Sequence, residues 1–211
     1  MNTHAKDLLH FLAPGFLHQL RTALLAVQGQ AQLLDPDTAA QPKAEIMAAT
    51  KRAQAAVQVL RYLSGDAGAV QAGMLLPRLV ELLSVPMAAR GLAVSAERSS
   101  ADAPARVSGK LLSEVVVGAL LSISEGLPTG FGGSLVVDLC AQSPDKVEIW
   151  VAFTADGGQL PFQVDLLAVQ QELQALISSR GGLALLVGEK LALHLPTVPP
   201  VQGERVEVGL G

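Results

Sequence analysis

The sequence is poor in aromatic residues, in charge and in cysteine. Aromatic residues make up 3% and charged residues 16% of the 211-residue chain, and the net charge is −4 with no block of Lys and Arg. Nucleic-acid-binding surfaces combine clustered basic residues with stacking aromatics, so we expect no nucleic-acid partner. The single cysteine, Cys140, cannot form an internal disulfide. It lies in an apolar strand pattern, and we interpret it as a packing residue.

Long apolar runs are also missing. Half of the residues are hydrophobic, yet no stretch reaches the roughly 18 uninterrupted apolar residues of a membrane span. The first ten residues lack the apolar core and cleavage site of a signal peptide. We therefore expect no membrane segment and a cytoplasmic location, which the single cysteine also favours. The high apolar content then points to a large core or an oligomer interface, and we favour a helical bundle shared between subunits.

The first third of the chain has helical periodicity. A helix is predicted over about residues 5–35, and Pro14-Gly15 predicts a kink or a late helix start within it. A second helix is predicted over about 39–64. One helical hairpin cannot cover its own apolar stripe, so we expect two copies to form a dimeric four-helix bundle. The stripe of the first helix consists of Leu17, Leu20, Leu24, Val27, Ala31 and Leu34.

Helices and strands are mixed in the remainder of the chain. The predicted fold class is α+β: an N-terminal helical hairpin, residues 1–68, followed by an α/β sandwich, residues 69–196, and a tail, residues 197–211. The linker is placed near 65–73, and the sandwich is expected to carry its helices on one face of a mixed sheet. Its predicted helices are 74–90, 108–126 and 164–180; its predicted strands are 92–98, 134–142, 146–155 and a closing hairpin, LALLVG and LALHLP, within 183–196.

HQLRTAL, residues 18–24, resembles the phosphoacceptor box of sensor histidine kinases, whose usual form is HELRTPL. LLPRLVELLSVPMAARGLAVSAE, residues 75–97, resembles the start of that family's ATP-binding domain. LLSEVVVGALLSISEGLPTG, residues 111–130, resembles its nucleotide-site helix, and KVEIWVAFTADGGQLP, residues 146–161, its first Gly box. The resemblance covers about residues 10–196. It implies a homodimer with a histidine-kinase ATPase-like sandwich on each subunit and His18 as the phosphoacceptor.

The chain departs from this family at its nucleotide site. Gly118 and Ser122 stand where the family has two asparagines that help to hold magnesium and phosphates. Phe153 stands where an aspartate reads the adenine amino group, and phenylalanine accepts no hydrogen bond. Asp156 belongs to a Gly-containing loop in a shifted register. The second Gly-rich box is missing, because residues 162–170 contain no glycine, and phosphate binding needs close backbone approach.

The residue after the histidine departs as well. In the family an acidic side chain there acts as a base in phosphoryl transfer from ATP, whereas Gln19 cannot take a proton. The loss of a base slows such a step by roughly 10²–10⁴-fold. We therefore expect no ATP-dependent autophosphorylation, no bound cofactor, and Mg²⁺ only on a partner receiver domain.

His18, Gln19, Arg21 and Thr22 are the candidate site residues. A neutral imidazole attacks phosphorus and gives a labile phosphoramidate suited to relay; the alternative is a leftover histidine in a degenerate fold. Arg21 fits a phosphoryl group or an acidic partner surface, or makes a structural ion pair. By the resemblance, Thr22 matches the residue that positions a hydrolytic water; otherwise it is a surface threonine. The other histidines, His4, His10 and His194, have no metal-ligand spacing.

These features predict a histidine phosphotransferase of a two-component phosphorelay. His18 would exchange a phosphoryl group with aspartates of response-regulator receiver domains, without autokinase activity. A pseudokinase that acts as a binding scaffold for regulators or kinases is the alternative, and a weak ATP-dependent kinase is a third. His18→Ala separates the first two, and nucleotide binding separates the third from both.

Overall fold

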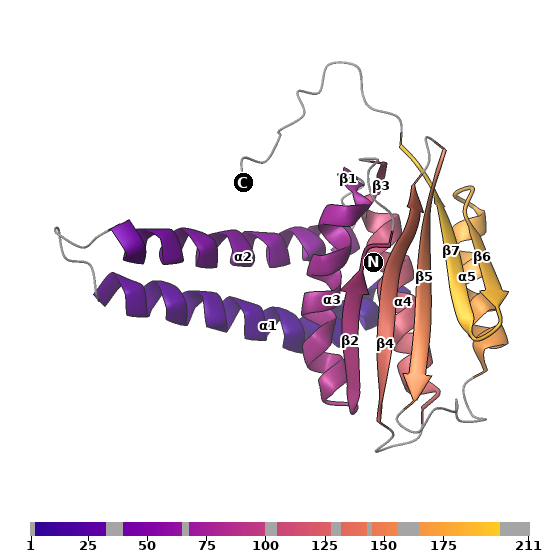
Figure 1. Cartoon of the computed structure of the whole chain (residues 1–211), viewed down its shortest axis with the longest axis horizontal. Helices are drawn as coiled ribbons and strands as arrows, with labels where there is room; N and C mark the ends of the chain where they lie inside the picture. Colours follow the sequence, from indigo (N-terminus) through magenta and orange to yellow (C-terminus); the bar gives the residue numbers. More distant parts are fainter. Residues whose placement is uncertain are drawn as a thin grey trace.

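In the computed structural model, a long helical hairpin projects from an α/β sandwich (Figure 1). The structure describes residues 3–32, 40–64, 68–99, 105–127, 132–142, 145–155 and 165–198. Helices α1 (Thr3–Gln32) and α2 (Ala40–Ser64) run side by side and form the hairpin. The predicted fold class, a helical hairpin followed by an α/β sandwich, is confirmed.

Helix α1 runs without interruption through Pro14 and Gly15. The alternative of a late helix start there is therefore wrong, and a kink at this point stays a prediction. Proline lacks the N–H of a helical hydrogen bond, and its ring crowds the preceding turn. The cost is offset because this part of α1 is packed against the sandwich, where the buried side chains of Leu8, Phe11 and Leu12 hold it.

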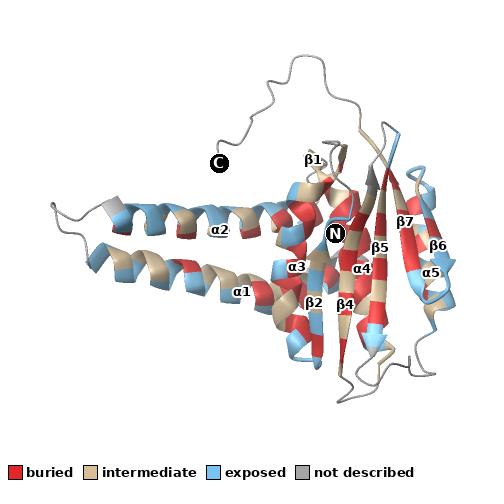
Figure 2. Cartoon of the chain, viewed as in Figure 1, coloured by how far each residue is buried: buried red, intermediate tan, exposed pale blue. Residues whose placement is uncertain are grey.

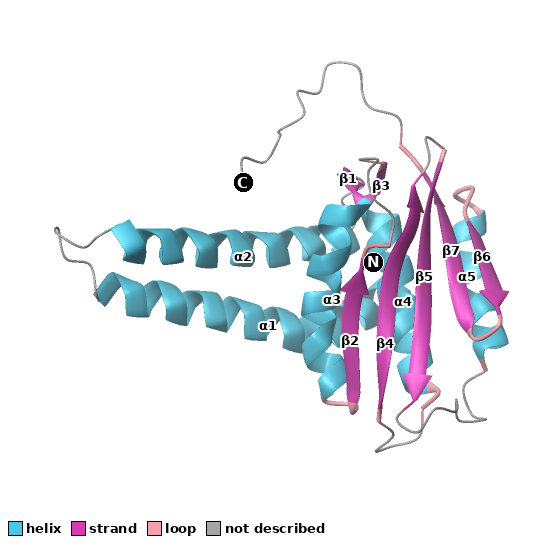
Figure 3. Cartoon of the chain, in the orientation of Figure 1, coloured by secondary structure: helices cyan, strands magenta, loops and turns pink. Residues whose placement is uncertain are grey.

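The main sheet has five strands in the order β2-β4-β5-β7-β6. Only β2 and β4 are parallel, and the other neighbours are antiparallel, so the expected mixed sheet is confirmed. Helices α3, α4 and α5 cover one of its faces (Figure 3). The bounds are α3 (Ala72–Ala88), β2 (Leu92–Glu97), α4 (Gly109–Glu125), β4 (Gly133–Gln142), β5 (Lys146–Ala155), α5 (Leu166–Ser178), β6 (Leu183–Val187) and β7 (Lys190–Pro196).

Two short strands were not predicted. β1 (Ala69–Gln71) lies in the expected linker and pairs antiparallel with β3 (Arg106–Ser108) at the end of the expected loop. Thr197 bridges to Val107 beside them. Three residues are too few to display the alternation by which a strand is recognised in sequence, so this small sheet is visible only in three dimensions.

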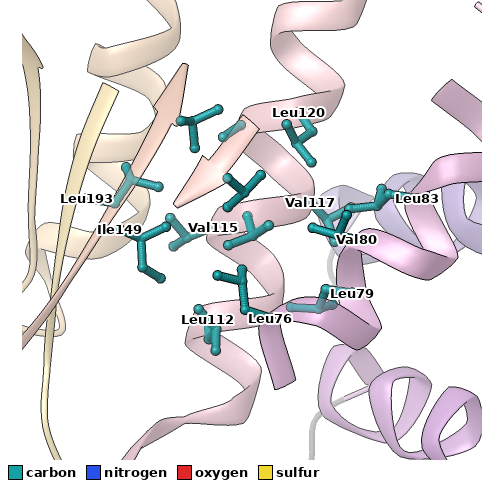
Figure 4. Packing of buried hydrophobic residues seen from close by; sticks show 14 of the residues in the cluster. Leu76, Leu79, Val80, Leu83, Leu112, Val115, Val117, Leu120, Ile149 and Leu193 are labelled. Carbon is teal, nitrogen blue, oxygen red and sulfur yellow. The ribbon is translucent and has the colours of Figure 1, made fainter. Parts of the chain in front are cut away.

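Helix α4 forms the centre of the core. Its side chains Leu112, Val115, Val117 and Leu120 lie between α3 and the sheet, as Figure 4 shows. The same hydrophobic cluster continues into the hairpin, and burial is concentrated in the sandwich and the adjoining end of the hairpin (Figure 2). We call that end the root of the hairpin. Its residues are Leu8, Phe11, Leu12 and Gly15 of α1 with Val59, Tyr62 and Leu63 of α2.

The predicted division at residue 68 thus crosses a continuous core, and whether the two regions behave as separate domains stays a prediction. In the described ranges, no helix combines the length and the apolar character that spanning a membrane requires.

Candidate functional site

His18 lies on α1, three residues after Gly15 of the root of the hairpin. Its side chain is exposed, as are those of Arg21 and Thr22. Residues three and four apart are neighbours on a helix surface, so the structure brings these three predicted site residues onto one exposed face. Among the described residues, none forms a hydrogen bond or an ion pair with the imidazole. Its nitrogen lone pair is thus open to a partner from solution.

The apolar residues around His18 are less covered than the sequence indicated. Leu20 and Val27 of the predicted stripe are half-buried, but Leu17 and Leu24 are 61% and 60% exposed. The neighbouring Leu25 is exposed to a similar extent. In the single chain the pairing of α1 with α2 therefore uses only part of the stripe. His18 lies beside a second apolar strip that this chain leaves in solvent.

Gln19 is turned toward the sandwich. Its Nε2 donates a hydrogen bond of 3.0 Å to Oε1 of Glu81 on α3. Gln19 follows Gly15 by one helical turn, on the side of α1 that meets α3. An amide held in this way neither removes a proton nor replaces the missing carboxylate. Glu81 is a residue of this site that sequence reasoning missed, because nothing in the sequence links positions 62 residues apart.

Two of the positions predicted for the nucleotide site, Gly118 and Ser122, lie at one cavity. A space of about 450 Å³ lies between α4 and α5 and is lined by both Gly118 and Ser122. A smaller extension of about 140 Å³ reaches Leu173 and Leu176 of α5. Gly118 contributes no side chain, and Ser122 Oγ donates to Glu172 Oε2 at 3.1 Å. Neither residue thus offers the amide that the family places there.

The charged residues lining this cavity are all acidic. They are Asp7 of α1, Glu125 of α4, and Asp165 and Glu172 at α5; none of the described lining residues is Lys or Arg. Like charges 4 Å apart repel by about 1 kcal/mol in water and by more in a partly enclosed space. A nucleotide triphosphate, with several negative charges, is therefore disfavoured here. No three His, Cys, Asp or Glu residues in the described ranges are grouped closely enough to hold a metal ion that would neutralise them.

Phe153 occupies a core position. It is 7% exposed on β5, opposite Leu135, and its ring lies beside Gly133. A ring packed in this way fills space and offers no acceptor to an adenine amino group. Asp156 and the adjoining loop lie outside the described residues, so the interpretation of that loop as a vestige of the nucleotide site stays a prediction.

Two polar clusters lie on the sheet face that carries no helix. Cys140 donates to Asp138, and burial followed by the nearby Asp138 carboxylate raises the pKa of its thiol to about 12. His194 Nε2 lies 3.3 Å from Glu148 Oε2 in the strand pair β5–β7. Cys140 is thus a protonated, weakly nucleophilic thiol at neutral pH. His194 has a carboxylate partner, whereas His18 has none among the residues that the structure describes.

Comparison with known proteins gives matches at the level of structure. No protein-family model matches the sequence, and no curated protein matches it significantly. A bacterial phosphotransferase is 18% identical with a TM-score of 0.41, over 92% of this chain and 97% of that chain. The mycobacterial sensor histidine kinase MprB is 15% identical with a TM-score of 0.42, over 64% and 100%. A histidine kinase from Burkholderia phymatum is 12% identical with a TM-score of 0.44, over 93% and 98%.

These solved structures are a phosphotransferase and histidine kinases, the class that the sequence resembles. At such identities the likeness concerns the fold alone.

Proposed function

We propose that this chain is a histidine phosphotransferase of a two-component phosphorelay and lacks ATP-dependent autokinase activity. His18 exchanges a phosphoryl group with the aspartates of response-regulator receiver domains. The observation that carries the proposal is a contrast within one molecule. The histidine of the HQLRT motif is exposed and without a partner among the described residues, whereas carboxylates line the cavity at the degenerate nucleotide positions.

The transfer step needs little from this chain beyond position and a nucleophile. A nitrogen lone pair of the neutral His18 imidazole attacks the phosphorus of an aspartyl phosphate on the receiver. The N–P bond forms as the P–O bond to the aspartate breaks, and the aspartate leaves as a carboxylate. A Mg²⁺ ion bound by the receiver would supply the charge balance for the phosphoryl oxygens. The reverse step loads a second receiver.

Arg21 and Thr22 are the supporting residues in this scheme. Both are exposed on the same face as His18. The Arg21 guanidinium is a permanent cation with donors suited to phosphoryl oxygens. The Thr22 hydroxyl can orient a water molecule, which would give the site a phosphatase reaction on a receiver. Gln19 is held by Glu81 and has no proton-transfer role.

A homodimer is part of the proposal. Soluble monomers seldom leave many large apolar side chains exposed along one element. The hairpin exposes Leu17, Leu24 and Leu25 on α1 and Met47 and Val57 on α2. A second copy of the hairpin would cover such residues in a four-helix bundle. His18 would then stand at the rim of this interface.

The test uses receiver domains chemically phosphorylated on aspartate. Each is mixed with the wild-type chain, with His18→Ala and with His10→Ala, a matched control because His10 is also an exposed histidine of α1. We expect acid-labile, base-stable label on the wild type and on His10→Ala, and none on His18→Ala.

Two results would contradict the proposal. Label that survives in His18→Ala would place the phosphoacceptor elsewhere. Receivers that bind the chain without ever labelling it would favour the pseudokinase scaffold, for which the exposed apolar strip beside His18 is the supporting observation.

A further inference from the structure

The acidic cavity and His18 are connected by one helix. Asp7 of α1 lines the cavity, and His18 follows eleven residues later on the same helix. At 1.5 Å per residue this places the two about 16 Å apart along the helix axis. In-line phosphoryl transfer needs reacting atoms about 3 Å apart. A group in the cavity thus reaches His18 of its own chain only if the sandwich separates from α1.

Gly15 lies between these two points and approaches the backbone of the sandwich closely. A Cβ built on Gly15 would lie 2.9 Å from the carbonyl carbon of Leu82 on α3, and still closer to the carbonyl oxygen. The two backbones are therefore in direct contact, and only glycine permits this. At this contact no side chain lies between the two backbones. A change of rotamer therefore cannot make room for the helices to slide past each other.

Other contacts fix the root of the hairpin from further directions. The Arg90 guanidinium lies 4.9 Å from the Phe11 ring centroid and donates to Ser124 Oγ, which joins α1 to α4. On the α2 side, a Cβ on Gly109 of α4 would lie 2.7 Å from the Tyr62 ring. Close contacts on both helices prevent the hairpin from pivoting about one of them.

Two side chains of α3 hold the point at which the hairpin leaves the sandwich. Glu81 accepts from Gln19 of α1 at 3.0 Å, and Arg78 donates to Gln58 of α2 at 3.3 Å. Arg78 and Glu81 are three residues apart and thus neighbours on the helix surface. Each contacts one helix of the hairpin, and the residue held on α1, Gln19, directly follows His18.

We propose that the hairpin and the sandwich form one rigid body, and that Gly15 is the positioning residue that holds His18 at a fixed place relative to the sandwich. The cavity then never reaches the His18 of its own chain, whatever it binds. This inference rests on the proposed function only for the role of His18, because rigidity is measured without any phosphoryl donor.

Distances between two spin labels test the rigidity directly. In a Cys140→Ser background, labels are placed through Gln28→Cys on the outer half of α1 and Ser95→Cys on β2, both exposed positions. Labelled chains are diluted with unlabelled protein so that distances within one chain dominate. We expect one narrow distance distribution, unchanged by Mg-ATP. A broad or two-peaked distribution in the otherwise wild-type chain would overturn the proposal.

Gly15→Ala and Gly29→Ala form a matched pair on the same helix. Nothing lies within 4 Å of a Cβ on Gly29, so Gly29→Ala should leave the distribution narrow, whereas Gly15→Ala should broaden it. A mere loss of stability would lower the folded fraction without broadening the distances of folded molecules. A narrow, unshifted distribution in folded Gly15→Ala would assign Gly15 no positioning role.

Glu81 supplies a second, milder variant in case Gly15→Ala does not fold. Glu81→Ala removes the acceptor of Gln19, whereas Glu81→Gln keeps an acceptor oxygen at that place. We expect a broader distribution for Glu81→Ala and recovery in Glu81→Gln. Equal distributions for the wild type and both variants would overturn the role given to this contact.

The same variants are then assayed for phosphoryl transfer to His18 from a phosphorylated receiver. Gly15→Ala should lower the single-turnover transfer rate to His18 at saturating receiver by tenfold or more, and Gly29→Ala should not. A wild type that takes no label although its distances are narrow would refute the proposed function and leave the rigidity intact.

Discussion

The two halves of α1 illustrate two uses of an apolar helix. In the first half Leu8 and Leu12 are fully buried, and Gly15 touches the backbone of α3. Beyond Gly15, Leu17 and Leu24 are about 60% exposed. Both parts of the helix are rich in apolar residues, but large apolar side chains are buried against the sandwich only in the first part. This difference fits the proposals that the exposed part of α1 is apolar because a partner covers it, and that the buried part holds it in place.

The largest effect is expected in the buried half. Leu12→Ala removes a fully buried side chain and should lower the free energy of unfolding by about 2–5 kcal/mol, because a cavity remains. Denaturant titrations at several protein concentrations check this, and the loss should be the same at each. A loss below about 1 kcal/mol would show that the root of the hairpin is not part of the core.

The reactivity of the Cys140 thiol in the sandwich provides a second prediction on the contrast between covered and exposed side chains. Cys140 of the sandwich has a pKa of about 12 because of burial and the Asp138 carboxylate, against 9.0 for a free thiol. At pH 8 its thiolate fraction, and thus its alkylation rate, should be about 10³-fold below that of the unfolded chain. The rate should rise about tenfold per pH unit well beyond pH 9. A plateau near pH 9 would contradict this account of the cluster.

Dimerisation is the next prediction. Leu17→Gln with Leu24→Gln should raise the dissociation constant of the dimer by roughly 100-fold or more, because each leucine loses a hydrophobic contribution of about 1.5–3 kcal/mol. Light scattering over a concentration series measures the change, with Gln28→Ala as the control on the same helix. A wild type that is monomeric at high concentration would refute the four-helix bundle.

The smallest effect concerns the cavity. Gly118→Asn with Ser122→Asn should not restore ATP binding, because the four carboxylates remain. Adding Glu125→Lys and Glu172→Lys should tighten nucleotide binding by about tenfold at low salt, and the gain should shrink as salt screens the charges. Calorimetric titration measures both sets. Tight binding by the asparagine pair alone would show that charge is not the obstacle.

Much of the fold could be predicted because its elements are long and periodic. The predicted range 108–126 differs from α4 by one residue at either end, because the long run of Leu, Val and Ile in this helix is almost entirely buried. β1 and β3, with three residues each, could not be predicted. The small sheet depends on pairing between segments that are distant in the sequence.

The candidate site was predictable only where it is local. His18, Arg21 and Thr22 share an exposed face because their spacing is that of a helix turn. The Gln19–Glu81 hydrogen bond and the carboxylates of the cavity come from elements far apart in the chain. The predicted loss of nucleotide side chains at Gly118 and Ser122 gave no indication that the lining is acidic, because its carboxylates come from three elements that are distant in the sequence: α1, α4 and α5.

The most direct test of the central claim offers the chain two phosphoryl donors side by side. The wild type receives either labelled Mg-ATP or labelled phospho-aspartyl receivers under the same conditions, and the acid-labile label is mapped by peptide. We expect label on His18 from at least one receiver and none from ATP. Label on His18 from ATP would contradict the claim that this chain lacks autokinase activity. The absence of label from every receiver would contradict the claim that His18 transfers phosphoryl groups.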